Sequence, residues 1–207
     1  MKIFLAAAFV VFSSSAFAEG LEFWFNAGQS LVSNPDLGTV QACTTTALCQ
    51  AIGASSKDTQ LTDGFRFSLR GDFNTKEHMG YEMGYSYNRT QLQDNTTTPP
   101  QQSGMAYHQV MINAMFYATG QDARIRPFGT AGVGFVTFVQ PGASVSQGGG
   151  STKFGFNYGG GVKIKVKGPW AARFDVRQTS TPKPFGLPLA SGWFRSTEIS
   201  VGGGFGF

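Results

Sequence analysis

Apolar and polar residues alternate with a period of two along most of this chain, and this pattern favours β-strands over helices. The alternation is clearest in residues 152–167, where aromatic and aliphatic residues occupy one parity and lysine, asparagine and glycine occupy the other. It recurs in residues 64–73, 79–88, 171–179 and 193–207. We therefore predict five strands from alternation alone.

Three further segments, residues 21–32, 105–119 and 124–139, are compatible with strands and raise the predicted number to eight. In 105–119 both parities carry apolar residues. We expect one of the two sets to face outward, namely Val110, Ile112, Ala114 and Phe116. The pattern does not assign faces to residues 124–139.

The predicted connections between strands alternate between short and long, and this is typical of an up-and-down antiparallel barrel. The short ones are 74–78, 120–123 and 167–170, and the long polar ones are 33–60, 93–103, 140–151 and 180–192. The 28 glycines and 20 phenylalanines suit strands better than a helical bundle. The longest apolar run, residues 3–12, is too short for a membrane-spanning helix, which needs about 20 residues. We predict an all-β fold, an eight-stranded antiparallel up-and-down transmembrane β-barrel.

The two faces of the predicted strands differ in charge, and this difference favours a membrane barrel. The apolar parity is rich in aromatics and uncharged in each clear strand, whereas the other parity combines small residues with basic and acidic ones. Charges inside a narrow barrel must neutralise each other, because burying one alone costs several kcal/mol. The residues expected to form an interior ion-pair network are Arg66, Arg70, Asp72, Glu82, Lys163, Lys165, Arg173, Asp175, Arg177 and Glu198. A soluble, exported, lipocalin-like barrel with the opposite sense is the alternative.

Three stretches carry a resemblance to a known family: residues 199–207, 126–134 and 156–162. Over essentially all of residues 19–207 the chain resembles the small bacterial outer-membrane β-barrels of the OmpA-barrel, OmpX and Ail type, often grouped as the outer membrane protein β-barrel domain. The resemblance implies an outer-membrane location, with the barrel-assembly machinery as a partner. It also implies that Val201, Phe205 and Phe207 in the last strand form the assembly signal. The chain departs from the family in its longer first loop and in lacking a peptidoglycan-binding domain after the barrel.

Residues 1–18 are predicted to be a cleaved signal peptide. Lys2 is followed by the apolar run 3–12 and then by the small-x-small site Ala16-Phe17-Ala18. A short buried N-terminal helix is the alternative. Export to an oxidising compartment predicts a disulfide between the only two cysteines, Cys43 and Cys49. A metal site at this pair is the weaker hypothesis, because two ligands without a nearby histidine do not complete a zinc site.

Amphipathic aromatic residues near the strand ends predict where the membrane interfaces lie. We expect Trp170 to belong to the periplasmic girdle and Trp193 to the outer girdle. Arg195 has outward parity near the outer rim. Together with Lys183 in the preceding loop it either contacts lipopolysaccharide phosphates or is a solvated rim charge.

Few residues in the chain could support catalysis. His78 lies in a predicted periplasmic turn, and His108 lies near the outer rim, where a triad with Ser103 and Asp94 would resemble that of lipid-modifying barrel enzymes. The glycine run 148–150 lacks the lysine of a phosphate-binding loop. We therefore expect no catalytic residue, no metal and no cofactor.

The function expected from the sequence is structural or interactive, with extracellular loops that serve adhesion or ligand display. The expected partners are outer-membrane lipid, lipopolysaccharide and an extracellular surface ligand, and the protein is expected to be a monomer. Nucleic acid is not expected, because the basic residues are scattered over the strands. Two alternatives remain: a narrow pore, weakly anion-selective because basic residues outnumber acidic ones inside, and a lipid A-modifying enzyme. An interior closed by ion pairs is favoured over a pore, because eight strands enclose a lumen that side chains can fill.

Overall fold

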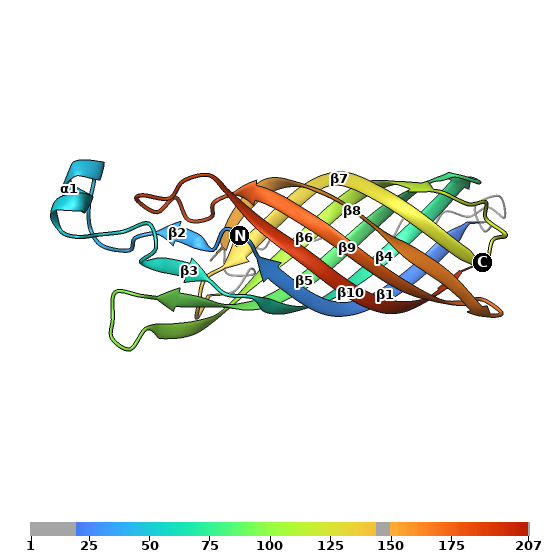
Figure 1. The fold of residues 1–207 in the computed structure, drawn as a ribbon, viewed down its shortest axis with the longest axis horizontal. Helices are drawn as coiled ribbons and strands as arrows, with labels where there is room; N and C mark the ends of the chain where they lie inside the picture. Colours follow the sequence, from blue (N-terminus) through green and yellow to red (C-terminus); the bar gives the residue numbers. More distant parts are fainter. Residues whose placement is uncertain (1–19, 144–149, 207) are drawn as a thin grey trace, which may run out of the picture.

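The computed structural model describes residues 20–143 and 150–206, which form a closed barrel of tilted strands with an elaborate set of loops at one end (Figure 1). Eight long strands make up the barrel, as predicted. They are β1 (Leu21–Val32), β4 (Gly64–Lys76), β5 (Met79–Asp94), β6 (Gln101–Tyr117), β7 (Ile125–Val139), β8 (Gly150–Lys167), β9 (Trp170–Pro182) and β10 (Trp193–Gly206).

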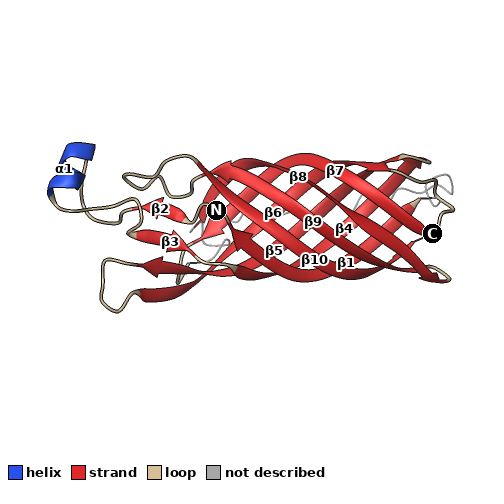
Figure 2. Cartoon of the chain, in the orientation of Figure 1, coloured by secondary structure: helices blue, strands red, loops and turns tan. Residues whose placement is uncertain are grey.

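Each strand of the barrel pairs antiparallel with its sequence neighbours, and β1 pairs with β10 to close the cylinder. The closing register places Glu22 opposite Gly206, so the start of β1 and the end of β10 lie at the same end. The tight connections β4–β5, β6–β7 and β8–β9 lie at this end too, which we call the short-turn end. The opposite, long-loop end carries the other connections (Figure 2). Closure leaves no unpaired strand edge in the barrel wall.

The barrel has an apolar outer wall, as the alternation predicts. Large side chains such as Phe25, Leu69, Met83, Phe135 and Val201 are exposed on it. On β6, Val110, Ile112 and Phe116 face outward as expected. On β7 the odd-numbered residues from Ile125 to Phe135 face outward, and Arg126, Phe128, Thr130, Val136 and Phe138 are buried inside. A continuous apolar belt around a closed barrel is what a hydrocarbon environment requires.

The long-loop end contains more regular structure than the sequence analysis predicts. The β5–β6 hairpin continues to Asp94 and Gln101, so only residues 95–100 form its loop. The first loop, loop 1 (residues 33–63), contains two short strands, β2 (Asp36–Gly38) and β3 (Thr59–Leu61), and β3 pairs with the extended part of β5. Alternation over three residues is too short to be recognised as a strand. Loop 1 also contains α1 (Thr46–Ala51), and no helix among the described residues is long and apolar enough to cross a membrane.

Candidate functional site

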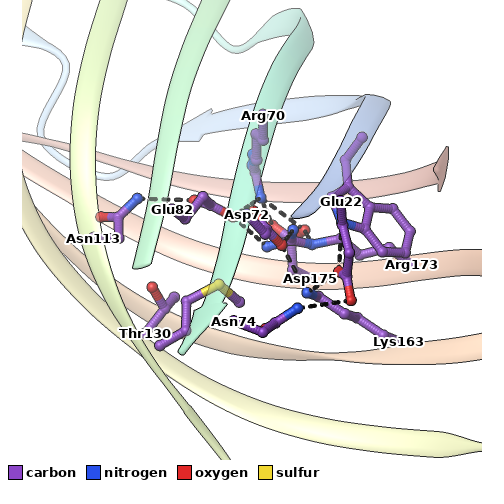
Figure 3. Close-up of polar contacts among 12 residues, drawn as sticks. Glu22, Arg70, Asp72, Asn74, Glu82, Asn113, Thr130, Lys163, Arg173 and Asp175 are labelled. Carbon is purple, nitrogen blue, oxygen red and sulfur yellow. Dashed lines mark hydrogen bonds and ion pairs between the residues drawn. The ribbon is translucent and has the colours of Figure 1, made fainter. Parts of the chain in front are cut away.

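The middle of the barrel lumen is occupied by buried charged side chains, with Glu82 of β5 at their centre (Figure 3). Its carboxylate accepts hydrogen bonds from Arg173 Nη2 at 2.7 Å and from Arg177 Nη1 and Nη2 at 2.6 and 2.9 Å. Asn113 Nδ2 on β6 donates to Glu82 Oε1 at 2.9 Å. This single carboxylate therefore links β5, β6 and β9 across the lumen.

Arg173 connects three carboxylates through three different nitrogens. Besides its bond to Glu82, its Nη1 lies 3.0 Å from Asp72 Oδ2 and its Nε lies 3.0 Å from Asp175 Oδ2. Arg70 Nη1 donates to the same Asp175 oxygen at 2.9 Å. A planar guanidinium with five donors suits this position, whereas a lysine ammonium would concentrate its charge at one point.

Towards the short-turn end the network continues to Glu22 on β1. Its carboxylate accepts hydrogen bonds from Lys163 Nζ at 2.5 Å, Trp24 Nε1 at 3.0 Å and Asn74 Nδ2 at 2.9 Å. Lys163 Nζ also lies 2.7 Å from Asp72 Oδ2, which joins Glu22 to the central group. Arg126 stacks its guanidinium 3.8 Å from the centroid of the Tyr117 ring.

Towards the long-loop end the charged layer finishes with the ion pair between Arg66 and Glu198. Arg66 Nη2 also donates to Ser86 Oγ at 2.6 Å. Above this pair, the Tyr107 hydroxyl is hydrogen-bonded to Ser30 and lies 3.1 Å from Ser196 Oγ. Polar side chains therefore occupy the lumen from Glu22 up to Tyr107.

Nine of the ten residues expected in the interior network are buried in the lumen and take part in ion pairs with one another or with Glu22. Lys165 is not part of the network: it is exposed at the short-turn end, where its Nζ donates to the Gln121 carbonyl at 2.7 Å. Parity on β8 suggests an inward side chain, but Lys165 lies beyond the height at which the lumen is enclosed. Glu22 and Arg126 belong to the network although the sequence analysis did not include them. Glu22 is next to Leu21 and Arg126 is next to Pro127, and both neighbours face outward. Parity would therefore have placed the two charged side chains in the lumen if the faces of these strands had been known.

An apolar cap closes the long-loop end of the lumen. It consists of Leu37 and Leu61 from loop 1 and Phe185 and Leu187 from the β9–β10 loop, packed on inward residues of β6, β7 and β10. The inward residues are Met105, Tyr107, Met111, Val136, Phe138 and Phe194. Phe138 makes edge-to-face contact with Phe194 at a centroid distance of 5.2 Å. The two loops therefore behave as part of the barrel interior rather than as free surface segments.

Lys183 joins the two loops of the cap. Its Nζ donates to the Asn34 carbonyl at 3.1 Å and also to the Asp36 carbonyl, and only 8% of the residue is exposed. Burial lowers the pKa of the Lys183 ammonium, and the Asp36 carboxylate opposes this effect only partly. The suggested role of Lys183 in contacting lipopolysaccharide is therefore wrong, because the side chain turns inward towards loop 1.

The outermost part of loop 1, residues 40–55, is a tip held together by a disulfide and a capped helix. Cys43 and Cys49 form the predicted disulfide. Thr45 caps α1 by accepting a hydrogen bond from Leu48 N at 3.2 Å. Three apolar side chains on this tip, Val40, Leu48 and Ile52, are 57%, 45% and 46% exposed. The disulfide and the N-cap of α1 hold these apolar side chains in contact with water, where they contribute no hydrophobic stabilisation to the fold.

The residues predicted for the membrane interfaces lie on the outer wall. Trp170 is exposed at the short-turn end, and Trp193 and Arg195 are exposed at the long-loop end. Val201 faces outward on β10, and Phe205 has the same parity and packs on Phe23 at a centroid distance of 6.0 Å. Phe207 and the predicted signal peptide lie outside the described residues. Trp24 differs from the other tryptophans, since it lies buried inside the barrel.

The conceivable triad of His108, Ser103 and Asp94 is not assembled. His108 faces the outer wall, where its Nδ1 lies 2.7 Å from the Tyr85 hydroxyl. Ser103 is on the same strand five positions away, about 16 Å along the strand. Asp94 Oδ1 accepts hydrogen bonds from Thr96 N and Oγ1. His78 lies at the short-turn end against the Tyr117 carbonyl.

Comparison with known proteins agrees with this architecture. The family described as "Outer membrane protein beta-barrel domain" matches residues 4–207. No curated protein matches the sequence. Among solved structures, Neisserial surface protein A is similar with a TM-score of 0.58 at 13% identity, covering 91% of this chain and 97% of that one.

Two further structures share the fold. The outer membrane protein OprG from Pseudomonas aeruginosa has a TM-score of 0.56 at 14% identity, with 91% and 96% of the two chains covered. The attachment invasion locus protein Ail of Yersinia pestis, in complex with the heparin analogue sucrose octasulfate, has a TM-score of 0.51 at 12% identity, with 91% and 99% covered. At these identities the likeness concerns the fold alone.

Proposed function

The chain belongs to the outer membrane protein beta-barrel domain family, and on this premise we propose that it is a non-enzymatic surface protein that binds a partner protein through loop 1. In this proposal the long-loop end faces outward from the cell and the short-turn end faces the periplasm. The barrel serves as a rigid mount, and the loops determine what is bound. The predicted export signal and a monomeric state are parts of the same proposal.

The braced apolar tip of loop 1 is the observation that carries this proposal. Val40, Leu48 and Ile52 are exposed on a segment that a disulfide and a helix cap hold in one shape. Holding this shape in advance lowers the entropy lost on binding. Exposed apolar side chains held in a fixed shape are typical of a contact site for another protein.

The loops at the long-loop end carry few basic side chains, and this supports a protein partner over a polyanion. Of the two lysines described in the connections at this end, Lys57 is exposed, and Lys183 is buried against backbone carbonyls. Recognition of sulfate or phosphate groups requires several convergent basic side chains. The Yersinia protein is named for attachment and was solved with a heparin analogue. For the present chain we propose attachment as well, but to a protein and not to a sulfated sugar.

Side chains fill the lumen, and this argues against the alternative that the protein is a pore. The charged network and the apolar cap block the passage at two levels, and eight strands leave little space beside them. The lipid A enzyme alternative has no assembled triad to support it, since His108, Ser103 and Asp94 lie apart. We retain a lipopolysaccharide contact at Arg195 and recognition of the last strand by the barrel-assembly machinery as proposals, supported by the outward positions of Arg195 and Val201.

Cell adhesion tests the proposed function. Cells that display the wild-type protein should adhere to at least one coat in a panel of purified serum and matrix proteins, and Leu48→Asp/Ile52→Asp should abolish that gain. Gln101→Asp/Gln140→Asp adds the same charge elsewhere at the long-loop end and should leave adhesion unchanged. Adhesion that is insensitive to the tip substitutions, or that occurs only on a heparin coat, would refute the proposal.

A further inference from the structure

An apolar groove of about 620 Å³ crosses the outer wall of the barrel over β5, β4, β1 and β10. Two adjacent rows of outward residues, each following the strand register, form it. The first row is Tyr85, Leu69, Phe25 and Gly203, and the second is Met83, Gly71, Phe23, Phe205 and Trp170. Its volume falls within the range of about 300–1,000 Å³ that is usual for small-molecule sites.

Two outward glycines create this groove. Gly71 interrupts the second row and Gly203 interrupts the first, and their direct partners across β1 are Phe23 and Phe25. A Cβ added at either glycine would meet no other atom within 4 Å. The hollow is therefore the space of two missing side chains between bulky neighbours, and it can be filled without disturbing the backbone.

One end of the groove lies at the short-turn rim, one strand away from a positive charge. Trp170, the first residue of β9, lies in the groove wall, and its ring is tilted against that of Phe205 at a centroid distance of 6.0 Å. Its register partner across the β8–β9 turn is Lys167, which is exposed. A tryptophan and a lysine at the end of an apolar surface mark the level of lipid headgroups.

We propose that this groove holds one phospholipid of the periplasmic leaflet, with an acyl chain along Phe23 and Phe25 and its phosphate at Lys167. The orientation of the leaflet rests on the proposed function, which places the short-turn end in the periplasm. Lipopolysaccharide would approach from the opposite rim.

Native mass spectrometry of the protein purified from outer membranes in mild detergent tests this proposal. We expect the wild type to retain one phospholipid and Gly71→Leu/Gly203→Leu to lower the retained fraction by about tenfold or more, because leucine fills the groove. Gly129→Leu is the matched control, since Gly129 is also exposed and has nothing within 4 Å of its Cβ position. Lys167→Gln should lower retention as well, whereas Lys57→Gln on loop 1 should not.

Three outcomes would overturn the proposal. They are equal retention in the wild type and the double variant, retention of lipopolysaccharide in place of phospholipid, and a wild-type dimer that the double variant loses. Resistance of the folded band to detergent before heating establishes that each variant is folded. If the double variant does not assemble, Gly71→Leu and Gly203→Leu alone provide the same comparison. The lipid result is independent of adhesion, so failure of either proposal can be recognised separately.

Discussion

At the residue scale, the main feature of this protein is that buried charges share their partners. Glu82 accepts hydrogen bonds from Arg173, Arg177 and Asn113, and each of the two arginines also contacts Asp175. A buried ion pair gains little over an apolar pair of the same shape, but removing one partner leaves a charge without compensation. The network therefore makes the barrel sensitive to single substitutions that change its charge.

We predict that Glu82→Ala destabilises the barrel by about 3–5 kcal/mol, because two buried guanidinium groups lose their shared acceptor. The free energy of unfolding in urea, measured with the protein in lipid vesicles, gives this value. Glu77→Ala in the exposed β4–β5 turn is the control and should change stability by less than about 0.5 kcal/mol. A loss below about 1 kcal/mol for Glu82→Ala would mean that water or a rearranged network replaces the carboxylate.

Lys183 predicts a dependence of stability on pH. Its pKa is lowered in the folded protein, so the unfolded chain binds more protons in the alkaline range just below the ordinary lysine pKa. The stability of the wild type relative to Lys183→Met should therefore rise as the pH increases from about 7 to about 10. Unfolding of both proteins in urea at the two pH values measures the difference. A constant or falling difference would show that the carbonyl contacts of Lys183 offset its burial.

At the element scale, loop 1 consists of two parts with different anchors. The β2–β3 part is fixed to the barrel, since β3 pairs with β5 and Leu37 and Leu61 enter the cap. The tip with α1 is held by the Cys43–Cys49 disulfide and, at its base, by hydrogen bonds that Asp58 accepts from Gln41 and Ser55. Damage to the tip should therefore remain local.

We predict that Cys43→Ser/Cys49→Ser loosens the tip without changing barrel stability. Closing so short a loop contributes about 2 kcal/mol by chain entropy, and this contribution concerns the tip alone. Limited proteolysis should cleave the variant within residues 40–55 faster than the wild type, while the urea midpoint of the barrel stays the same. A lowered midpoint would show that the tip supports the cap.

At the scale of the whole molecule, the closed lumen follows from two blocks of different chemistry. The charged network fills the middle, and the cap of loop 1 and the β9–β10 loop covers the long-loop end. Opening one block leaves the other in place. We therefore expect the lumen to stay closed to ions.

We predict that the wild-type protein carries no stable current in planar lipid bilayers. Phe185→Gly/Leu187→Gly, which weakens the cap, should be silent too, because the network beneath it remains. Single-channel recording on the refolded protein is the measurement. Stable conductance in the wild type would restore the pore alternative, and conductance in the cap variant alone would locate the gate in the cap.

Much of this architecture could be predicted from local pattern. In a strand, neighbouring side chains point to opposite faces, so parity separates Phe154 from Lys163, and the charges on one parity indicate which face is the lumen. The eight strands and the closed barrel are confirmed by the structure. Where both parities are apolar, as in β7, pattern fails, and the inward position of Arg126 could not be recognised.

The sequence by itself determined the eight barrel strands, the faces of most of them and most of the charges available to the lumen, because these depend on neighbours in the chain. Only the tertiary structure decided which charges meet. Arg70 and Asp175 are 105 positions apart and are brought together by barrel closure and strand register. The same register leaves Lys165 outside the lumen and turns Lys183 into the cap, since the depth of a side chain is a property of the assembled cylinder and not of any single strand.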